Sequence, residues 1–421
     1  MAKPTLALIP AAQGSKFYSV LPSNGVGDFQ FSRSGSATRI NKDGLIETVS
    51  SGVSRLNYPL IDGVVKGCPS HLLEPSRTNL ITYSEDFSQS DWSGGNVTRE
   101  LNQIISPDGT LNATKLSATA SFSQIQQSYT SVNNTDYTLS LFVKSPSSNV
   151  IGLRLASGVN DVRREFNLST LSIQSMGGNN QELIDEGIVD FGNGWYRIFL
   201  TCKSDGTSSF LNIYPKNSSD ATFQSVYVWG AMLEQNSVAS SYIPTQGTIQ
   251  TRSAETANGS GDAATFNDSE GVLMAEISAL ANDGTNRRIS ISDGTTSNRL
   301  LLSYNSTSNQ IQSFLANPTV QFNFYHTLSN SIEFNKIAVK YKQNDFALWI
   351  NGVKVETDTN GTIANGLNTL NFDEGSGASD FYGNTKQIQY FDTALNDSDL
   401  ETLTSWTSFT DMANGQQYSI K

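Results

Sequence analysis

Short runs of alternating apolar and polar residues, joined by Asn-Gly dipeptides, constrain the fold of this chain more than any other feature. The clearest case is the segment DFALWINGVKVET, in which Phe346, Leu348 and Ile350 occupy one face of an expected strand. Asn351-Gly352 follows, and these two residue types readily adopt the positive φ angles of a two-residue hairpin turn. The segment therefore predicts an antiparallel hairpin.

The same pattern recurs along most of the chain. Alternation predicts a half-buried strand at Tyr137–Lys144, and IVDFGNGWYRIFLTC holds two strands around Asn193-Gly194. Near the C-terminus, YFDTALNDSDLETL predicts a short helix after the last strand. The sequence as a whole predicts an all-β protein built from tandem β-sandwich (jelly-roll) domains.

The composition limits the class of protein. A chain of 421 residues is too long for a single hydrophobic core, so two or three domains are expected. Aromatic residues make up 10% of the sequence, which excludes a disordered chain. The net charge of -12 argues against a nucleic-acid partner and against docking on an anionic membrane. No segment reaches a membrane-spanning length, and the early apolar run, broken by Pro10, is too short for a signal peptide.

Changes in composition predict four segments. Residues 1–72 are expected to form an N-terminal anchoring or oligomerisation segment, with an edge extension of the first sandwich or a mobile tail as alternatives. Pro75 marks the start of the first sandwich, expected at 73–252. Residues 253–268 are polar, contain Gly and lack aliphatic anchors, which predicts a linker. A second sandwich is expected at 269–421.

Three segments carry a family resemblance. LLEPSRTNLITYSEDFSQSDW, with SRSGSATRINKDGLIETV upstream and VYVWGAMLEQNSVASSYIPT downstream, resembles a stretch of tailed-phage virion structural proteins. These are tail or head fibres and adhesin-like proteins that often carry carbohydrate-binding-module-like sandwiches. The C-terminal strand–Asn-Gly–strand order followed by YFDTALNDSDLETL resembles concanavalin A-like lectin and laminin-G-like domains.

The resemblance implies a non-enzymatic fibre or adhesin at the virion surface. Its N-terminal segment would contact other virion proteins, and its sandwiches would bind a host-surface glycan. Fibres are homo-oligomers, so a trimer is expected first and a dimer second. A purely structural capsid decoration or head-fibre protein is one alternative, and a polysaccharide depolymerase is another.

The residues themselves give no catalytic signature. His71 and His326 are the only histidines and stand in unrelated contexts, so no Ser-His-Asp or Cys-His set is indicated. No strand shows the paired acids that glycoside hydrolysis requires. We therefore expect no enzyme activity.

No cofactor is expected, with calcium left open. The sequence has neither a Cys/His cluster for zinc nor an EF-hand loop. Glu85, Asp86 and Glu234 lie near the expected start and end of the first sandwich, where the first and last strands could bring them together to bind calcium. The alternative is that each is an ordinary charge at the rim of the sandwich.

Aromatic residues beside polar, turn-rich sequence are the glycan-binding candidates, because sugars stack their C–H faces on exposed rings. Each could instead pack at the rim of a sandwich. Trp349 is of special interest because it lies opposite the apolar row of its strand, where it could stand on an open sheet face. The full set is Trp92, Tyr214, Tyr304, Tyr325, Trp349 and Tyr382.

Overall fold

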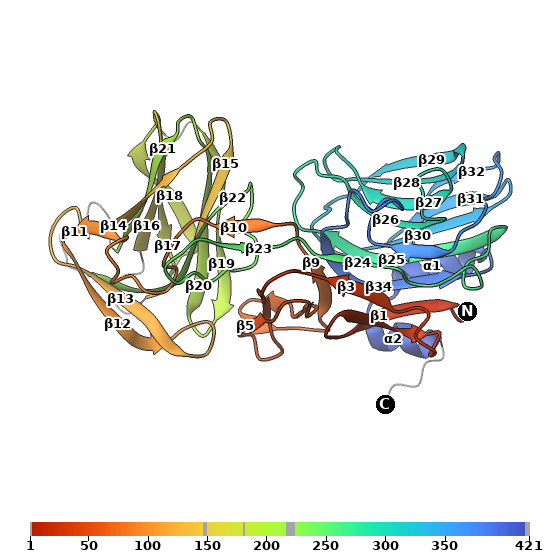
Figure 1. Cartoon of the computed structure of the whole chain (residues 1–421), viewed down its shortest axis with the longest axis horizontal. Coiled ribbons are helices and arrows are strands. Elements are labelled where there is room, and N and C mark those ends of the chain that lie inside the picture. Colours follow the sequence, from red (N-terminus) through yellow and green to blue (C-terminus); the bar gives the residue numbers. More distant parts are fainter. Residues whose placement is uncertain (1, 146–149, 180–181, 216–223, 417–421) are drawn as a thin grey trace.

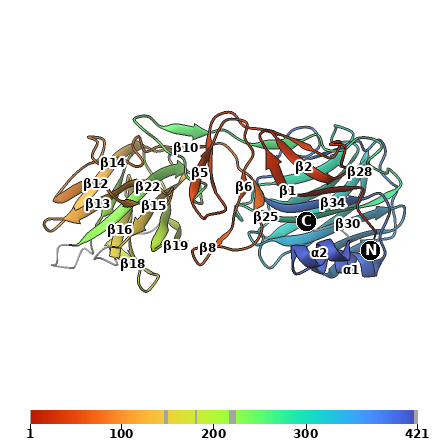
Figure 2. The same cartoon turned by 90° about the horizontal axis from the view of Figure 1, so that it is seen from below.

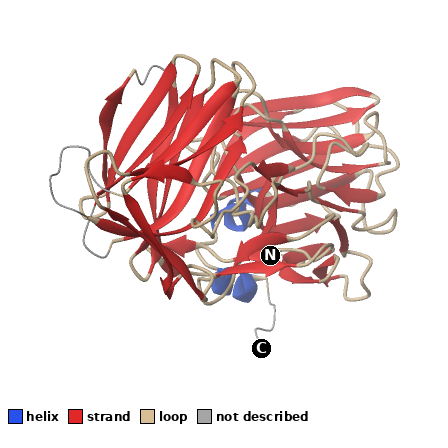
Figure 3. Ribbon diagram, turned by 60° about the vertical axis from the view of Figure 1, so that its left-hand side comes forward, coloured by secondary structure: helices blue, strands red, loops and turns tan. Residues whose placement is uncertain are grey.

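The structure, a computed structural model, describes residues 2–145, 150–179, 182–215 and 224–416. The described strands form two β-sandwiches that lie side by side along the longest axis of the molecule (Figure 1). Strands dominate and the described helices are short, as Figure 3 shows. The predicted all-β fold is confirmed. No helix within the described ranges is long and apolar enough to cross a membrane.

The first sandwich packs two six-stranded sheets face to face. Leu139 and Leu141 of one sheet meet Leu153 and Ile213 of the other in a shared core, as the alternation predicts. In sheet order, one sheet contains β12 (Val97–Ile105), β13 (Leu111–Ala118), β22 (Ser225–Gln235), β15 (Asp136–Lys144), β20 (Trp195–Lys203) and β19 (Leu183–Gly192). The other contains β11 (Ser93–Gly95), β14 (Gln124–Thr130), β21 (Ser208–Tyr214), β16 (Val150–Ser157), β17 (Asn160–Asn167) and β18 (Ser172–Gly178).

The second sandwich packs a large sheet against a five-stranded one. The large sheet follows the order β24 (Thr256–Asn258), β3 (Phe29–Ser32), β2 (Lys16–Leu21), β1 (Leu6–Gln13), β34 (Gly383–Phe391), β25 (Glu270–Ala279), β30 (Asn335–Lys342), β31 (Phe346–Ile350) and β32 (Val353–Asp358), with β6 (Leu56–Asn57) and β9 (Ser70–Leu73) at its side. The smaller sheet contains β29 (Thr319–Thr327), β28 (Gln310–Asn317), β27 (Arg299–Tyr304), β26 (Arg287–Ser292) and β33 (Thr369–Asn371).

The remaining elements lie on or between the sandwiches. Helix α1 (Asp397–Ser405) packs on the outer face of the large sheet, and the other helix of the described residues is α2 (Phe409–Gly415). Three two-stranded pairs complete the described strands: β4 (Ala37–Ile40) with β5 (Ile46–Val49), β7 (Leu60–Ile61) with β8 (Val64–Val65), and β10 (Arg77–Asn79) with β23 (Gln250–Arg252). Figure 2 shows β5, β6 and β8 between the two sandwiches.

The hairpins predicted from Asn-Gly dipeptides are confirmed. Asn351 and Gly352 have φ angles of 49° and 85°, and they join β31 to β32. Asn193 and Gly194 have φ angles of 54° and 75°, and they join β19 to β20. Both pairs adopt the left-handed conformation that a tight turn between twisted strands requires.

The predicted boundary at residue 72 does not separate two structural units. Strand β1 pairs with β34, with Leu6 opposite Tyr390, and β2 and β3 extend the same sheet. Leu6, Leu8 and Phe17 are buried in the core of the second sandwich. The first sandwich is thus inserted between strands of the second. An anchoring role for residues 1–72 stays a prediction.

The segment predicted as a linker, 253–268, is also part of the second sandwich. Strand β24 pairs with β3, and Ala257 and Phe266 are buried in the same core. Glu255 is buried as well and forms ion pairs with Arg33 and Arg55. The prediction relied on the absence of aliphatic anchors, but a small residue, an aromatic ring and a charge fix this segment instead.

Candidate functional site

Three of the predicted glycan-binding aromatics are buried. Trp92 donates its indole N–H to the carbonyl of Tyr83 at 2.8 Å, and the hydroxyl of Tyr304 donates to the carbonyl of Ile277 at 3.0 Å. Trp349 packs against Leu400 and Leu403 of helix α1. A ring without solvent exposure cannot stack on a surface sugar, so the prediction is wrong for Trp92, Tyr304 and Trp349.

Two of the predicted aromatic residues, Tyr325 and Tyr382, lie at separate positions on the second sandwich. Tyr325 on β29 is 47% exposed, and its hydroxyl accepts hydrogen bonds from the amides of Gln312 (2.8 Å) and Asn323 (3.1 Å). Tyr382 is half-buried against the core and donates its hydroxyl to Asp380 at 3.0 Å. Burial and this neighbouring carboxylate raise the pKa of Tyr382. A glycan role for either tyrosine stays a prediction.

Tyr214 lines a hollow on the first sandwich that we call the outer-face pocket. It has a volume of about 240 Å³ and is lined by Phe122, Ser123, Gln124, Arg154, Arg163, Met176 and Tyr214. Neighbouring strands bring the side chains together. Arg154 lies opposite Arg163 on β17, and Tyr214 lies opposite Gly152 on β16. Directly opposed residues of antiparallel strands point to the same face, so these side chains lie on the outer side of the sheet.

Gly152 creates the floor of the outer-face pocket. A Cβ at this position would lie 2.6 Å from the sulfur of Met176 and 3.2 Å from the Cβ of Tyr214. Both side chains therefore lean over the glycine backbone, into space that any other residue would fill. The glycine permits this close approach in the middle of a strand.

Two arginines bring guanidinium groups to the pocket. Arg154 forms two hydrogen bonds to Asp161, at 2.6 and 3.0 Å, and Arg163 contacts the same carboxylate at 2.5 Å. Partial burial opposes ionisation of Asp161, but the two arginines lower its pKa overall. The guanidinium of Arg154 also stacks over the ring of Phe210, 4.4 Å from its centroid. The two arginines thus share the carboxylate of Asp161 beside Tyr214, and the carboxylate of Glu165 lies opposite Gly152 on the same face.

Beside the pocket, the partly exposed amides of Gln124 and Gln126 are held by the fully buried amide of Asn212. The amide of Asn212 donates to the side-chain oxygens of Gln124 (3.0 Å) and Gln126 (3.1 Å). The Oδ1 atom of Asn212 is buried and has no hydrogen-bond partner among the described residues. Planar amides in fixed orientations can donate to and accept from vicinal sugar hydroxyls.

Phe122 is the most unusual residue at the pocket. It is 90% exposed, and its φ of 58° places it in the left-handed region, which is uncommon for a non-glycine residue. Holding a bulky residue in this conformation costs about 1–3 kcal/mol, and the exposed ring gains no burial in return. Leu171 shares the exposure and the left-handed φ, so what sets Phe122 apart is its place at the rim of the pocket.

Sequence reasoning missed Phe122, Arg154 and Arg163. The only local signal for Phe122 is an isolated aromatic residue flanked by serines in a turn. The two arginines are nine positions apart, and only the β16–β17 register shows that they meet.

The predicted calcium residues do not converge. Glu85 and Asp86 line a separate groove of about 700 Å³, the end groove, together with Asn112. Glu234 is fully buried and accepts hydrogen bonds from the backbone N–H and the hydroxyl of Ser240, both at 2.8 Å. The described part of the chain holds no group of three or more acids, histidines or cysteines placed for a metal ion. A calcium site that includes Glu234 is therefore wrong, whereas Glu85 and Asp86 stay candidates.

Comparisons with known proteins give fold-level likeness only. No family model matches the sequence, and no curated protein matches it. Among solved structures, the CBM40 of Ruminococcus gnavus IT-sialidase bound to alpha2,3 sialyllactose aligns at a TM-score of 0.30 and 17% identity, over 35% of this chain and 94% of that one. Trypanosoma rangeli sialidase aligns at 0.29 and 10%, over 70% and 58%. Mouse laminin alpha1 LG4-5 aligns at 0.23 and 8%, over 78% and 95%. Scores this low assign no function.

Proposed function

We propose that this protein is a non-enzymatic glycan-binding protein. The observation that carries the proposal is the outer-face pocket, where the exposed ring of Phe122 stands beside Tyr214, Arg154 and Gln124. A ring offers a stacking surface for the C–H face of a sugar, while amide and guanidinium groups bond its hydroxyls. Arg154 and Arg163 offer guanidinium donors to an acidic group on such a sugar.

The finer proposal is a fibre or adhesin on the surface of a phage virion. Its support is the resemblance of the segments around Pro75 to tailed-phage structural proteins. A single pocket of this size binds weakly, so several copies on one particle would provide avidity. We propose a homo-oligomer, with a trimer first, that contacts other virion proteins through its N-terminal part.

Binding to a glycan array tests the first part of the proposal. Phe122→Ala should lower the affinity for the best array ligand by about tenfold. It should not affect folding, because the ring is solvent-exposed. Leu171→Ala is the matched control, since Leu171 is also exposed (56%), has a φ of 52° and lies outside the pocket. No saturable binding on the array, or equal loss in both variants, would contradict glycan recognition at this pocket.

Negative-stain microscopy of virions with a labelled antibody tests the second part. A structural decoration or head-fibre protein would label particles but bind no glycan. A fibre or adhesin would label particles and also bind host cells or polysaccharide, and Phe122→Ala would reduce that binding.

A depolymerase is the second candidate, and the end groove favours it. Burial raises the pKa of Glu85, and the hydroxyl of Tyr242 and the side chain of Asn112 contact this carboxyl group. Asp86 is partly buried, yet hydrogen bonds from Gln89 and Ser88 lower its pKa. Two carboxyl groups with pKa values shifted in opposite directions suit acid–base chemistry on a sugar. A reducing-end assay that shows product release by the wild type, and none by Glu85→Gln, would support this function instead.

A further inference from the structure

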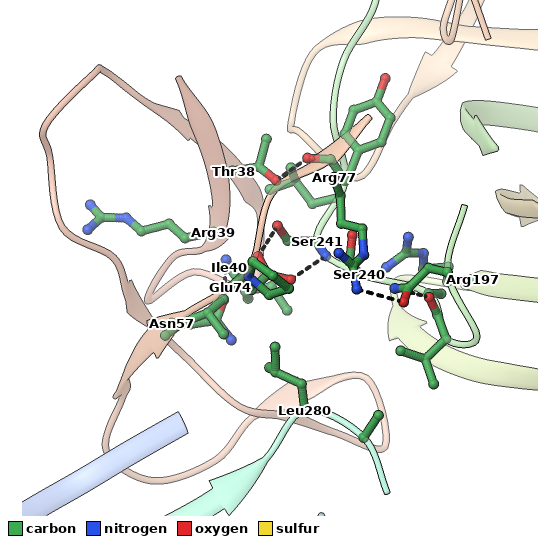
Figure 4. Close-up of a pocket in the computed structure, with 18 of the residues that line it drawn as sticks. Thr38, Arg39, Ile40, Asn57, Glu74, Arg77, Arg197, Ser240, Ser241 and Leu280 are labelled. Atoms are coloured by element: carbon green, nitrogen blue, oxygen red, sulfur yellow. Dashed lines mark hydrogen bonds between the residues drawn. The ribbon is translucent and has the colours of Figure 1, made fainter. Parts of the chain in front are cut away.

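A second cavity lies where the two sandwiches meet. This junction cavity has a volume of about 200 Å³, and residues from three regions line it. Figure 4 shows Thr38 and Ile40 from the N-terminal part, Arg197 and Ser240 from the first sandwich, and Leu280 from the second. A cavity formed by all three regions exists only in the assembled chain.

A buried ion network borders the cavity, and its Glu74 belongs to the lining. Glu255 contacts Arg33 at 2.7 Å and Arg55 at 2.9 Å. Glu74 accepts from Arg55 at 2.7 Å and from Arg252 at 3.2 Å. Burial opposes ionisation of Glu74, but Arg252 and Arg55 lower its pKa overall. Both carboxylates are therefore fully engaged by these three arginines.

Two further arginines line the cavity without a carboxylate. Arg77 donates to the carbonyl of Ser76 (2.8 Å) and to the side chain of Asn236 (3.0 Å), and Arg197 donates to the hydroxyl of Ser140 (2.9 Å). The Nε of each is buried and has no hydrogen-bond partner in the described structure. Neither forms an ion pair within 4.0 Å among the described residues. Burial lowers the pKa of Arg197, although an arginine stays protonated.

The acids nearest to these two arginines are already committed. Glu234 is held by Ser240, and burial raises its pKa despite the charges of Arg252 and Arg197. At the rim, Asp283 binds Arg287 at 2.8 Å, and Glu47 binds Arg39 at 2.9 Å. In a chain whose net charge is -12, Arg77 and Arg197 line this cavity with no carboxylate within 4.0 Å among the described residues, and Glu234 and Glu74 act on Arg197 only at longer range. Both guanidinium groups are partly buried, where an anion would complete their charge pairing.

Part of the cavity wall is apolar. In Figure 4, Ile40 lies to the left of Arg77 and Arg197, beside Glu74, and Leu280 lies below them; Phe191 also contributes to the lining. A planar guanidinium matches a carboxylate, and the apolar wall matches a hydrocarbon body. We propose that the junction cavity binds a small organic acid, with its carboxylate held by Arg77 and Arg197.

Calorimetric titration of the full chain with benzoate, hexanoate and acetate tests this proposal. Benzoate or hexanoate should bind saturably, acetate more weakly, and the neutral analogue benzamide should not bind. Arg77→Gln and Arg197→Gln should each weaken binding by about tenfold, because each removes a charge-assisted contact. Arg39→Gln is the matched control. It removes the same charge from the rim, but Arg39 already pairs with Glu47.

The titrations of the wild-type protein test the proposal by themselves, even if one arginine variant fails to fold. Lack of saturable binding for all three acids would overturn the proposal, and so would equal binding of benzamide. Unchanged benzoate affinity in both folded arginine variants would overturn it too. Phe122→Ala should leave benzoate binding unaltered, which separates this cavity from the proposed glycan site.

Discussion

Glu255 provides the sharpest test of whether the segment 253–268 is a fixed part of the second sandwich. Its buried carboxylate accepts hydrogen bonds from Arg33 (2.7 Å), from two nitrogens of Arg55 and from the backbone N–H of Glu74 (2.9 Å). Glu255→Gln preserves the side-chain volume but removes the negative charge. The new amide NH₂ group would face guanidinium N–H groups, and two donors cannot form a hydrogen bond. Breaking a buried ion pair by removing one partner costs about 3–5 kcal/mol.

Urea denaturation, followed by tryptophan fluorescence and circular dichroism, measures the effect. With a slope of about 1–3 kcal/mol per molar urea, the loss should lower the unfolding midpoint of the second sandwich by at least about 1 M. The control is Asp62→Asn, because the Asp62–Lys66 pair at 3.1 Å is solvent-exposed and should contribute less than about 1 kcal/mol. A loss below about 1 kcal/mol in Glu255→Gln would refute the reasoning and would fit a loosely held linker.

Two further predictions concern protons and metal. Burial lowers the pKa of His71 to about 3 from 6.5, so the unfolded chain takes up a proton below pH 6.5 that the folded chain does not. Stability should therefore fall as the pH drops from 6.5 toward 3, by at most about 1.4 kcal/mol per unit from this residue. His71→Phe should flatten the decline in urea midpoints between pH 7 and 5, and an unchanged slope would contradict it. If Glu85 and Asp86 bind calcium, adding Ca²⁺ after EDTA should raise the melting temperature of the wild type but not of Asp86→Asn; equal melting curves with and without Ca²⁺ would exclude the site.

The glycan-binding candidates show the limit of predicting side-chain exposure from the alternation within a single strand. Alternation correctly placed Trp349 on the face opposite Phe346 and Leu348. The sequence also predicted the C-terminal helix that became α1. It did not indicate that this helix covers that face of the sheet, because packing between elements distant along the chain leaves no local pattern.

The sequence alone determined the strands, the Asn-Gly turns and hence the all-β class, since period-2 alternation and positive φ angles depend on neighbouring residues only. Only the tertiary structure decided which strands pair. The contact between Leu6 and Tyr390 joins the two ends of the chain, and it makes the second sandwich discontinuous. The tertiary structure also decided which residues form the sites. Arg154 meets Arg163, and Arg77 lines the same cavity as Arg197, only through long-range packing.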